Sequence, residues 1–205
     1  MITAKKSTAF DVTVVIPYDR DRGWLQQAIN SVPSGTELIL SQSKGTRAYN
    51  INRGLEKVKT EFVKFLDEDD YITENCIEDS VRALEGVDFI HGNALNFYPK
   101  GKIKPYIPPC KYPTVQSLLK KNTIHNPTQM YRMNVFEKTG LFDESLYSSE
   151  DWEFNLRCLS KGLKIGYCNK FLTNYRVHPG QMTKANEERR LINKALVREK
   201  YKQWM

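Results

Sequence analysis

The sequence predicts an α/β fold in a single domain, with a mostly parallel central sheet flanked by helices. Short β-branched apolar runs alternate with segments whose apolar residues recur at helical spacing, which is the pattern of βαβ units. The chain has 205 residues, of which 40% are hydrophobic and 27% charged. This balance is typical of one ordinary globular core, and it excludes a disordered tail or a disulfide mini-protein.

Three strands are expected in the first half of the chain, at 11–17, 37–41 and 61–66, each a short apolar run. Helices are expected between them at 24–32 and 46–58, because their apolar residues fall on one face. Pro33 and Gly35 end the first helix, and Thr73 is expected to cap a third one. One or two further strands are expected over 87–98.

The second half begins with a stretch, 89–136, that holds no Asp or Glu. Its prolines predict an irregular loop, and a helix is expected over 134–139. Ser149 is expected to cap a helix that begins at Glu150. Two strands, at 165–168 and 171–177, and a charged helix over 185–205 complete the prediction, in which the helix either docks on the body or frays.

The chain carries no sign of export or membrane insertion. No apolar run approaches the ~20 residues of a membrane span, and no apolar stretch follows Lys5 and Lys6 as in a signal peptide. The four cysteines form no CxxC pair and no zinc-binding spacing. We therefore expect reduced thiols, no transmembrane segment and a cytoplasmic location.

Polar clusters follow two predicted strands, at 18–22 and 67–70. Ligands of open α/β sheets bind at the carboxyl ends of strands, so these clusters mark the expected site. Asp67, Glu68, Asp69 and Asp70 repel one another unless a cation lies among them, and Mg²⁺ or Mn²⁺ suits such oxygen ligands. The alternative is an acidic turn exposed to water.

Five motifs lie in the order and approximate spacing of one known family. They are Asp67-Glu68-Asp69, Asn52-Arg53-Gly54, Gly140-Leu141-Phe142-Asp143-Glu144, Glu150-Asp151-Trp152 and Tyr175-Arg176-Val177-His178. Together with the opening strand, they resemble the DxD, N-x-G, GxFDE, ED and late-histidine motifs of the inverting GT-A glycosyltransferases of family 2. The resemblance covers nearly the whole chain. It implies a GT-A (Rossmann-like) domain over 1–184, with a nucleotide-sugar-binding half (1–98) and an acceptor-side half (99–184).

The resemblance also implies a site. The donor would be a nucleotide-sugar, with UDP expected, and a divalent metal would neutralise the departing diphosphate. Asp69 would bind the metal, Asp67 would face the ribose and the metal, and His178 would reach the metal or the diphosphate. Asp151 would be the general base that deprotonates the acceptor hydroxyl, and the sugar carbon would invert. The expected nucleotide-sugar contacts are Pro17, Tyr18, Asp19, Ser41, Arg47, Asn52, Asp67 and Glu68.

Two of these contacts depart from the pattern or stay open. The family usually places a base-gripping aspartate after the second strand, whereas this chain has Ser41 and Gln42 there. Arg47 is either a phosphate-facing cation or a surface residue at the start of a helix.

The acceptor is expected to be anionic, because the chain carries a net charge of +7 and its acid-free stretch is basic and aromatic. Expected acceptor contacts are Glu150, Trp152, Lys100, Lys102 and Lys104. One hypothesis is an envelope glycan or lipid-linked saccharide, with peripheral contact to a membrane surface. Another is a hydroxymethylated base of phage-type DNA, flipped out of the duplex. A non-catalytic nucleic-acid- or glycan-binding module and a nucleotidyltransferase are alternatives of other classes, and a solvated loop is the alternative for the lysines.

Overall fold

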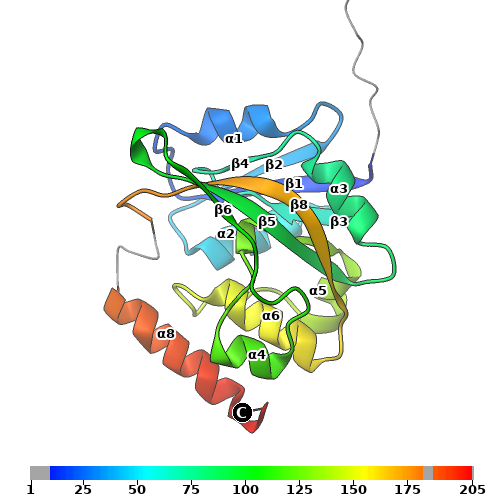
Figure 1. The fold of residues 1–205 in the computed structure, drawn as a ribbon, viewed down its shortest axis with the longest axis vertical. Helices are drawn as coiled ribbons and strands as arrows, with labels where there is room; N and C mark the ends of the chain where they lie inside the picture. Colours follow the sequence, from blue (N-terminus) through cyan, green and yellow to red (C-terminus); the bar gives the residue numbers. More distant parts are fainter. Residues whose placement is uncertain (1–9, 182–186, 205) are drawn as a thin grey trace, which may run out of the picture.

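The computed structural model describes residues 10–181 and 187–204. Its centre is an eight-stranded sheet in the order β2-β1-β3-β7-β5-β8-β4, with β6 on β5 (Figure 1). The strands are β1 Val12–Tyr18, β2 Glu37–Gln42, β3 Phe62–Phe65, β4 Tyr71–Ile72, β5 Phe89–Phe97, β6 Ile103–Tyr106, β7 Met130–Arg132 and β8 Ile165–Arg176.

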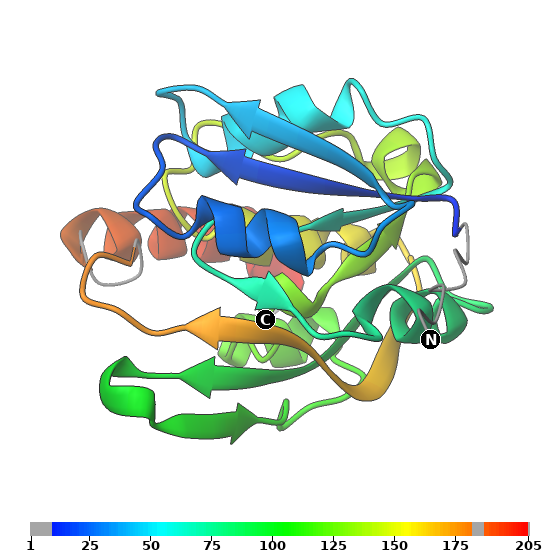
Figure 2. The ribbon, with the colours of Figure 1, turned by 90° about the horizontal axis from the view of Figure 1, so that it is seen from above.

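The sheet is mixed. β1 is parallel to β2 and β3, and β5 is parallel to β8. Because β7 is antiparallel to both β3 and β5, those two strands also share a direction. In the described part of the chain, five strands therefore run one way, and β1, β2 and β8 end on the same side of the molecule (Figure 2). The expectation of a mostly parallel sheet is right for strand direction, but four of the seven pairings are antiparallel.

Helices cover both faces of this sheet. They are α1 Leu25–Ser31, α2 Arg47–Leu55, α3 Cys76–Ala83, α4 Val115–Lys120, α5 Asn134–Thr139, α6 Glu150–Ser160 and α8 Glu187–Lys200, with short 3₁₀ turns η1 Pro99–Gly101, η2 Asn126–Thr128 and η3 Lys202–Trp204. Alternation along β1 divides the core, because Val14 and Ile16 pack towards α1 and α3 while Val15 packs towards α2, α5 and α6. The predicted helix over 134–139 has the bounds of α5.

Three local predictions are corrected. The two strands expected at 165–168 and 171–177 are one strand, β8, whose register shifts opposite Gly92 and Asn93. Thr73 does not cap α3, because its hydroxyl donates to the carbonyl of Phe171 at 2.7 Å, and Asn75 is the N-cap residue. Ser149 stands at the N-cap of α6 but makes no side-chain cap bond, because its backbone is left-handed (φ 68°).

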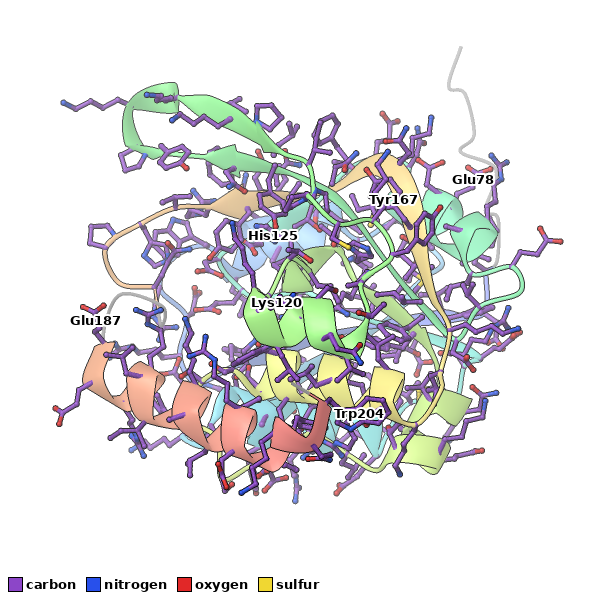
Figure 3. The ribbon with its side chains drawn as sticks, turned by 60° about the horizontal axis from the view of Figure 1, so that its bottom comes forward. Glu78, Lys120, His125, Tyr167, Glu187 and Trp204 are labelled. Atoms are coloured by element: carbon purple, nitrogen blue, oxygen red, sulfur yellow. The ribbon has the colours of Figure 1, made fainter. Side chains whose placement is uncertain are left out.

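The C-terminal helix α8 docks on the body (Figure 3). Val197 and Tyr201 are buried against α4 and α6 in a third apolar cluster. The Glu153 carboxylate, fully buried in α6, accepts from the Tyr201 hydroxyl at 2.9 Å and the Lys200 ammonium at 2.7 Å. A third donor, Arg157, comes from one turn further along α6. Two of the three donors to the buried charge therefore come from the end of α8 and the residue that follows it.

Candidate active site

The strands β1 and β8 end on the same side of the sheet (Figure 2). A cleft of about 440 Å³ is lined by residues from these two strand ends and from the segments beside them. Segments far apart in the chain line it: the end of β1, the start of α2, the turn after β3, the start of α6 and the segment after β8. It brings together ten of the predicted site residues: Pro17, Tyr18, Asp19, Arg47, Asp67, Glu68, Asp69, Glu150, Asp151 and His178.

His178 and Asp69 are in direct contact, with the imidazole Nε2 2.8 Å from a carboxylate oxygen. The His178 ring also packs against Trp24, with 4.6 Å between centroids. Burial and the neighbouring charge of Asp67 raise the pKa of Asp69, although the hydrogen bond from His178 opposes the shift. A carboxylate and an imidazole, distant in sequence, therefore face the same point of the cleft.

Arg176, at the end of β8, holds this corner in place. Its backbone NH donates to the buried carboxylate of Asp70 at 2.7 Å, and its Nε donates to the carbonyl of Asp69 at 2.8 Å. Its guanidinium lies between the rings of Trp24 and Phe97, 4.9 and 4.5 Å from their centroids. The acidic turn is thus fastened to the strand that leads to His178.

Arg47 is largely buried rather than a surface residue, and it lines the cleft with its guanidinium engaged by two carboxylates. Its Nε donates to Asp67 at 2.6 Å and its Nη1 to Glu150 at 3.1 Å, so it joins the acidic turn after β3 to the start of α6. The Asn126 amide, with its oxygen turned towards Arg47, accepts from Nη2 at 2.8 Å. Burial alone would lower the pKa of Arg47, but the charges of Asp67 and Glu150 outweigh it and raise this pKa.

The first turn of α6 presents Asp151 to the cleft. The left-handed backbone of Ser149, unusual for a residue other than glycine, directs the chain into this turn. Asp151 accepts from the NH of Trp152 at 2.7 Å, and burial raises the pKa of its carboxyl group. Burial also raises the pKa of Glu150, whose charge is matched by Arg47. Of the two neighbouring carboxylates, Asp151 is the one without an ion pair among the described residues.

A second ion-pair chain borders the cleft at the loop after β1. Arg22 pairs with Asp19 at 2.8 Å and also with Glu68. Burial and the charges of Asp69 and Asp67 raise the pKa of Glu68 to about 7, against the opposing charge of Arg22.

Asn50 organises the loops after β1 and β2. Its buried amide donates to the carbonyls of Tyr18 and Ser43 at 3.1 and 3.2 Å and accepts from the Ser43 hydroxyl at 2.6 Å. Asn50, Arg22 and Arg176 are not among the predicted contacts, although Arg22 lies in the polar cluster at 18–22 and Arg176 in the late-histidine motif. Their more distant partners, up to 107 residues away, cannot be inferred from those local patterns. Their residue types alone carry no signal.

The remaining predicted site residues do not line the cleft. Ser41 is buried beside α2, near Gly54. The buried Asn52 amide donates to the carbonyl of Phe142 at 2.9 Å and accepts from the backbone NH of Phe142 at 3.0 Å. These hydrogen bonds link the N-x-G motif to the GxFDE motif and stabilise the fold.

The other predicted acceptor contacts also lie outside the cleft. Trp152 is buried in the third apolar cluster, and its indole NH donates to Leu118 at 3.0 Å. Lys100, Lys102 and Lys104 are exposed on the β5–β6 hairpin.

The donor set at this corner suits a divalent cation that the substrate helps to bind. In the described ranges, no three His, Cys, Asp or Glu side chains converge on one point, since Asp67 is engaged by Arg47. Mg²⁺ usually takes one or two protein ligands and completes its shell with water and substrate phosphates. Asp69 and His178 supply that number at 2.8 Å from each other, and a cation beside them would relieve the repulsion that raises the pKa of Asp69.

Comparisons with known proteins identify the family and the fold. Residues 17–140, more than half of the chain, match the family model described as glycosyl transferase family 2. The chain belongs to glycosyl transferase family 2. The uncharacterized glycosyltransferase YwdF of Bacillus subtilis is 25% identical over 118 residues, covering 52% of this chain and 41% of YwdF. MJ1057 of Methanocaldococcus jannaschii, also an uncharacterized glycosyltransferase, is 25% identical over 137 residues, covering 64% of this chain and 45% of that protein.

Solved structures place this family 2 chain in the GT-A fold. Residues 1–349 of TarS from S. aureus, in complex with UDP-GlcNAc, superpose with a TM-score of 0.68 at 17% identity, covering 85% of this chain and 61% of that fragment. The complex of the same TarS fragment with UDP gives 0.65 at 18% identity, covering 82% and 61%. The predicted fold and family are therefore confirmed. The chain spans less than half the length of the two curated relatives it matches.

Proposed function

We propose that this chain is a metal-dependent inverting glycosyltransferase that moves a sugar from a UDP-sugar to a hydroxyl group of an anionic acceptor. The observation that carries the proposal is the shared cleft of about 440 Å³, which is lined by Asp69, His178 and Asp151 together. The family supports the reaction class. The TarS complexes with UDP-GlcNAc and UDP support the choice of donor.

Asp69 and His178 would hold Mn²⁺ or Mg²⁺, which when bound neutralises the charge that develops on the leaving diphosphate. Asp67 lies beside them and is oriented by Arg47. Tyr18 and Asp19 line the same cleft and would contact the nucleotide. Ser41 is buried outside the cleft, so the missing base-gripping aspartate has no replacement at that position.

Asp151 would take the proton from the acceptor hydroxyl as it attacks the sugar carbon. A carboxyl group whose pKa is raised by burial is a stronger base than one in water. Glu150 is engaged by Arg47, so it does not supply a second nucleophilic carboxylate. One base opposite one leaving group gives a single displacement, and we therefore propose inversion.

For the acceptor, we propose an envelope glycan or a lipid-linked saccharide. Hydroxymethylated DNA is a second candidate, favoured by the exposed Lys100, Lys102 and Lys104 on a hairpin that extends on the same side as the cleft (Figure 2). We also propose a cytoplasmic location on the basis of the four free cysteines. Within the described ranges, every helix is too short or too polar to cross a membrane.

The test is incubation of the protein with Mn²⁺ and a panel of sugar nucleotides, with released nucleoside diphosphate as the measurement. Slow hydrolysis of one donor is expected, and Asp151→Asn should keep donor binding while transfer falls at least 100-fold. Asp79→Asn is the matched control, because Asp79 lies on α3 outside the cleft. If no donor is bound or cleaved, or if Asp151→Asn transfers at the native rate, the proposed reaction is wrong.

A further inference from the structure

A second cavity of about 210 Å³ adjoins the cleft on the side of α8. It shares Ser148, Ser149 and Asp151 with the cleft, so the two spaces meet at the candidate base. Its remaining walls are Asn122, Trp152, Arg190 and Lys194. An acceptor hydroxyl at Asp151 therefore has a separate space behind it for the rest of the acceptor.

Positive charge from α8 faces this space. Arg190, Lys194 and Arg198 lie on successive turns, four residues apart, and so share one face of the helix. Arg198 extends over the ring of Trp152, 5.8 Å from its centroid. Burial and the charges of Arg190 and Arg198 lower the pKa of Lys194, although Asp151 opposes the shift. The three cations therefore repel one another beside the cavity.

These charges are incompletely matched. In the described part of the chain, Lys194 makes no ion pair or hydrogen bond, and Arg190 pairs only with Glu187, at 3.0 Å. The Nε of Arg190 is buried and has no hydrogen-bond partner there. Two cations that line one cavity and keep unused donors form a site that an anion would complete.

We propose that this cavity binds a phosphate group of the acceptor, held by Arg190 and Lys194, while the acceptor hydroxyl lies at Asp151; the inference rests on the proposed function. The substrate class is a phosphate-bearing saccharide or polyol in which the phosphate lies close to the reacting hydroxyl. The cavity shares Asp151 with the cleft, so both groups of one small acceptor can be held together.

The walls favour a saccharide or polyol over a nucleic acid. Binding of single-stranded nucleic acid relies on aromatic faces on which bases stack. Among the described wall residues, Trp152 is the aromatic one, and it is only 4% exposed with Arg198 over its ring. Asn122, Ser148 and Ser149 instead offer hydrogen-bonding groups, which suit hydroxyl-rich chains.

The experiment is a calorimetric titration of the whole protein, saturated with UDP and Mg²⁺, using glucose 6-phosphate, glucose and a single-stranded oligonucleotide that contains hydroxymethylcytosine. Glucose 6-phosphate should bind more tightly than glucose. Arg190→Gln combined with Lys194→Gln should weaken its binding about tenfold, and Lys194→Gln alone should give part of that loss. Lys57→Gln combined with Lys202→Gln is the matched control, because it removes the same charge from exposed positions outside both cavities.

The proposed phosphate subsite is wrong if glucose 6-phosphate and glucose bind with equal affinity. It is also wrong if the substitutions of Arg190 and Lys194 leave the affinity for glucose 6-phosphate unchanged. An oligonucleotide whose binding depends on these two residues while glucose 6-phosphate fails to bind would overturn it as well. Donor hydrolysis by the double variant separates the two proposals, since it should proceed at the native rate if only the acceptor site is lost. A protein that binds glucose 6-phosphate through Arg190 and Lys194 but cleaves no donor would support the anion site and refute the proposed reaction.

Discussion

Replacing Arg47 with methionine tests whether this arginine is the electrostatic link between the acidic turn and α6. The substitution keeps most of the side-chain volume but leaves Asp67 and Glu150 without their shared cation. The side chains of Arg47 and Glu150 are 12% and 5% exposed, so water replaces little of the lost interaction, whereas Asp67 at 21% regains some hydration.

The expected cost follows from this burial. Removing one partner of a buried ion pair destabilises a protein by about 3–5 kcal/mol, and partial exposure of Asp67 favours the lower value, about 3 kcal/mol. In a chain of this size, that loss lowers the melting temperature by roughly 6–12 °C.

The loss in free energy of unfolding caused by Arg47→Met should also depend on pH, and this deficit should be smaller at lower pH. Burial already raises the pKa of Glu150, and Arg47 opposes that shift, so the substitution raises this pKa further above its value in the unfolded chain. The folded variant then binds a proton at a pH where the unfolded chain has none. Its free energy of unfolding therefore rises relative to the native protein as the pH falls, and the deficit shrinks between pH 8 and pH 5.

The assay is urea denaturation followed by circular dichroism at several pH values, without added metal. Arg53→Met is the matched control, because Arg53 is an exposed residue of the same helix whose contact with the Tyr49 ring, at 5.9 Å, stabilises it little. The control should lose less than about 1 kcal/mol. An Arg47→Met protein within 1 kcal/mol of the native one, or a deficit that grows as the pH falls, would refute the reasoning.

Three further predictions concern stability. Tyr201→Phe removes one donor to the buried Glu153 carboxylate and should cost about 2 kcal/mol in urea denaturation, with faster amide exchange in α8. Gly54→Ala would place a Cβ 2.4 Å from a methyl of Val15, and overpacking should exceed the gain in helix propensity, for a net loss of about 1–2 kcal/mol in calorimetry. Burial lowers the pKa of His125 to about 4, so between pH 6.5 and pH 4 the unfolded chain binds a proton that the folded chain does not. Stability should therefore fall by about 2 kcal/mol over that range, and by less in His125→Phe, as measured by urea denaturation at each pH.

Each of these has a result that contradicts it. Tyr112→Phe is the control for the tyrosine, since Tyr112 is 67% exposed, and equal losses in the two variants would refute the buried-donor argument. Gly54→Ala should cost less when combined with Val15→Ala than the two changes cost separately, and strict additivity would count against overpacking. If the free energy of unfolding of His125→Phe depends on pH in the same way as that of the native protein, His125 is not the cause of the predicted loss of stability.

Much of the fold could be predicted from local patterns. The apolar run of β1 and the helical spacing in α2 and α5 depend on neighbours within a few residues, and each of these elements lies where the sequence places it. The caps of α3 and α6 could not be predicted this way. Thr73 turns to a carbonyl of β8, a strand 98 residues further along the chain, which a local pattern cannot anticipate.

The candidate site, too, could be predicted from the sequence only in part. The positions of Asp69, Asp151 and His178 could be proposed from motifs, because each motif is a short run of chemically distinctive residues. Asn52 and Trp152 belong to such runs as well, yet Asn52 bonds the backbone of Phe142 and Trp152 is buried in the core. Proximity to a motif thus predicts the element that carries a residue but not the direction of its side chain.

By itself, then, the sequence determined which segments become strands and helices and which of their ends carry charge, because hydrophobic periodicity and side-chain chemistry are local properties. Only the tertiary structure decided which charges meet. Arg47 reaches Glu150 across 103 residues, and the cations of α8 reach the cavity at Asp151 from the far end of the chain. Such pairings depend on how the packed elements are oriented, because a buried charge is matched by whichever partner the fold brings within a few ångströms.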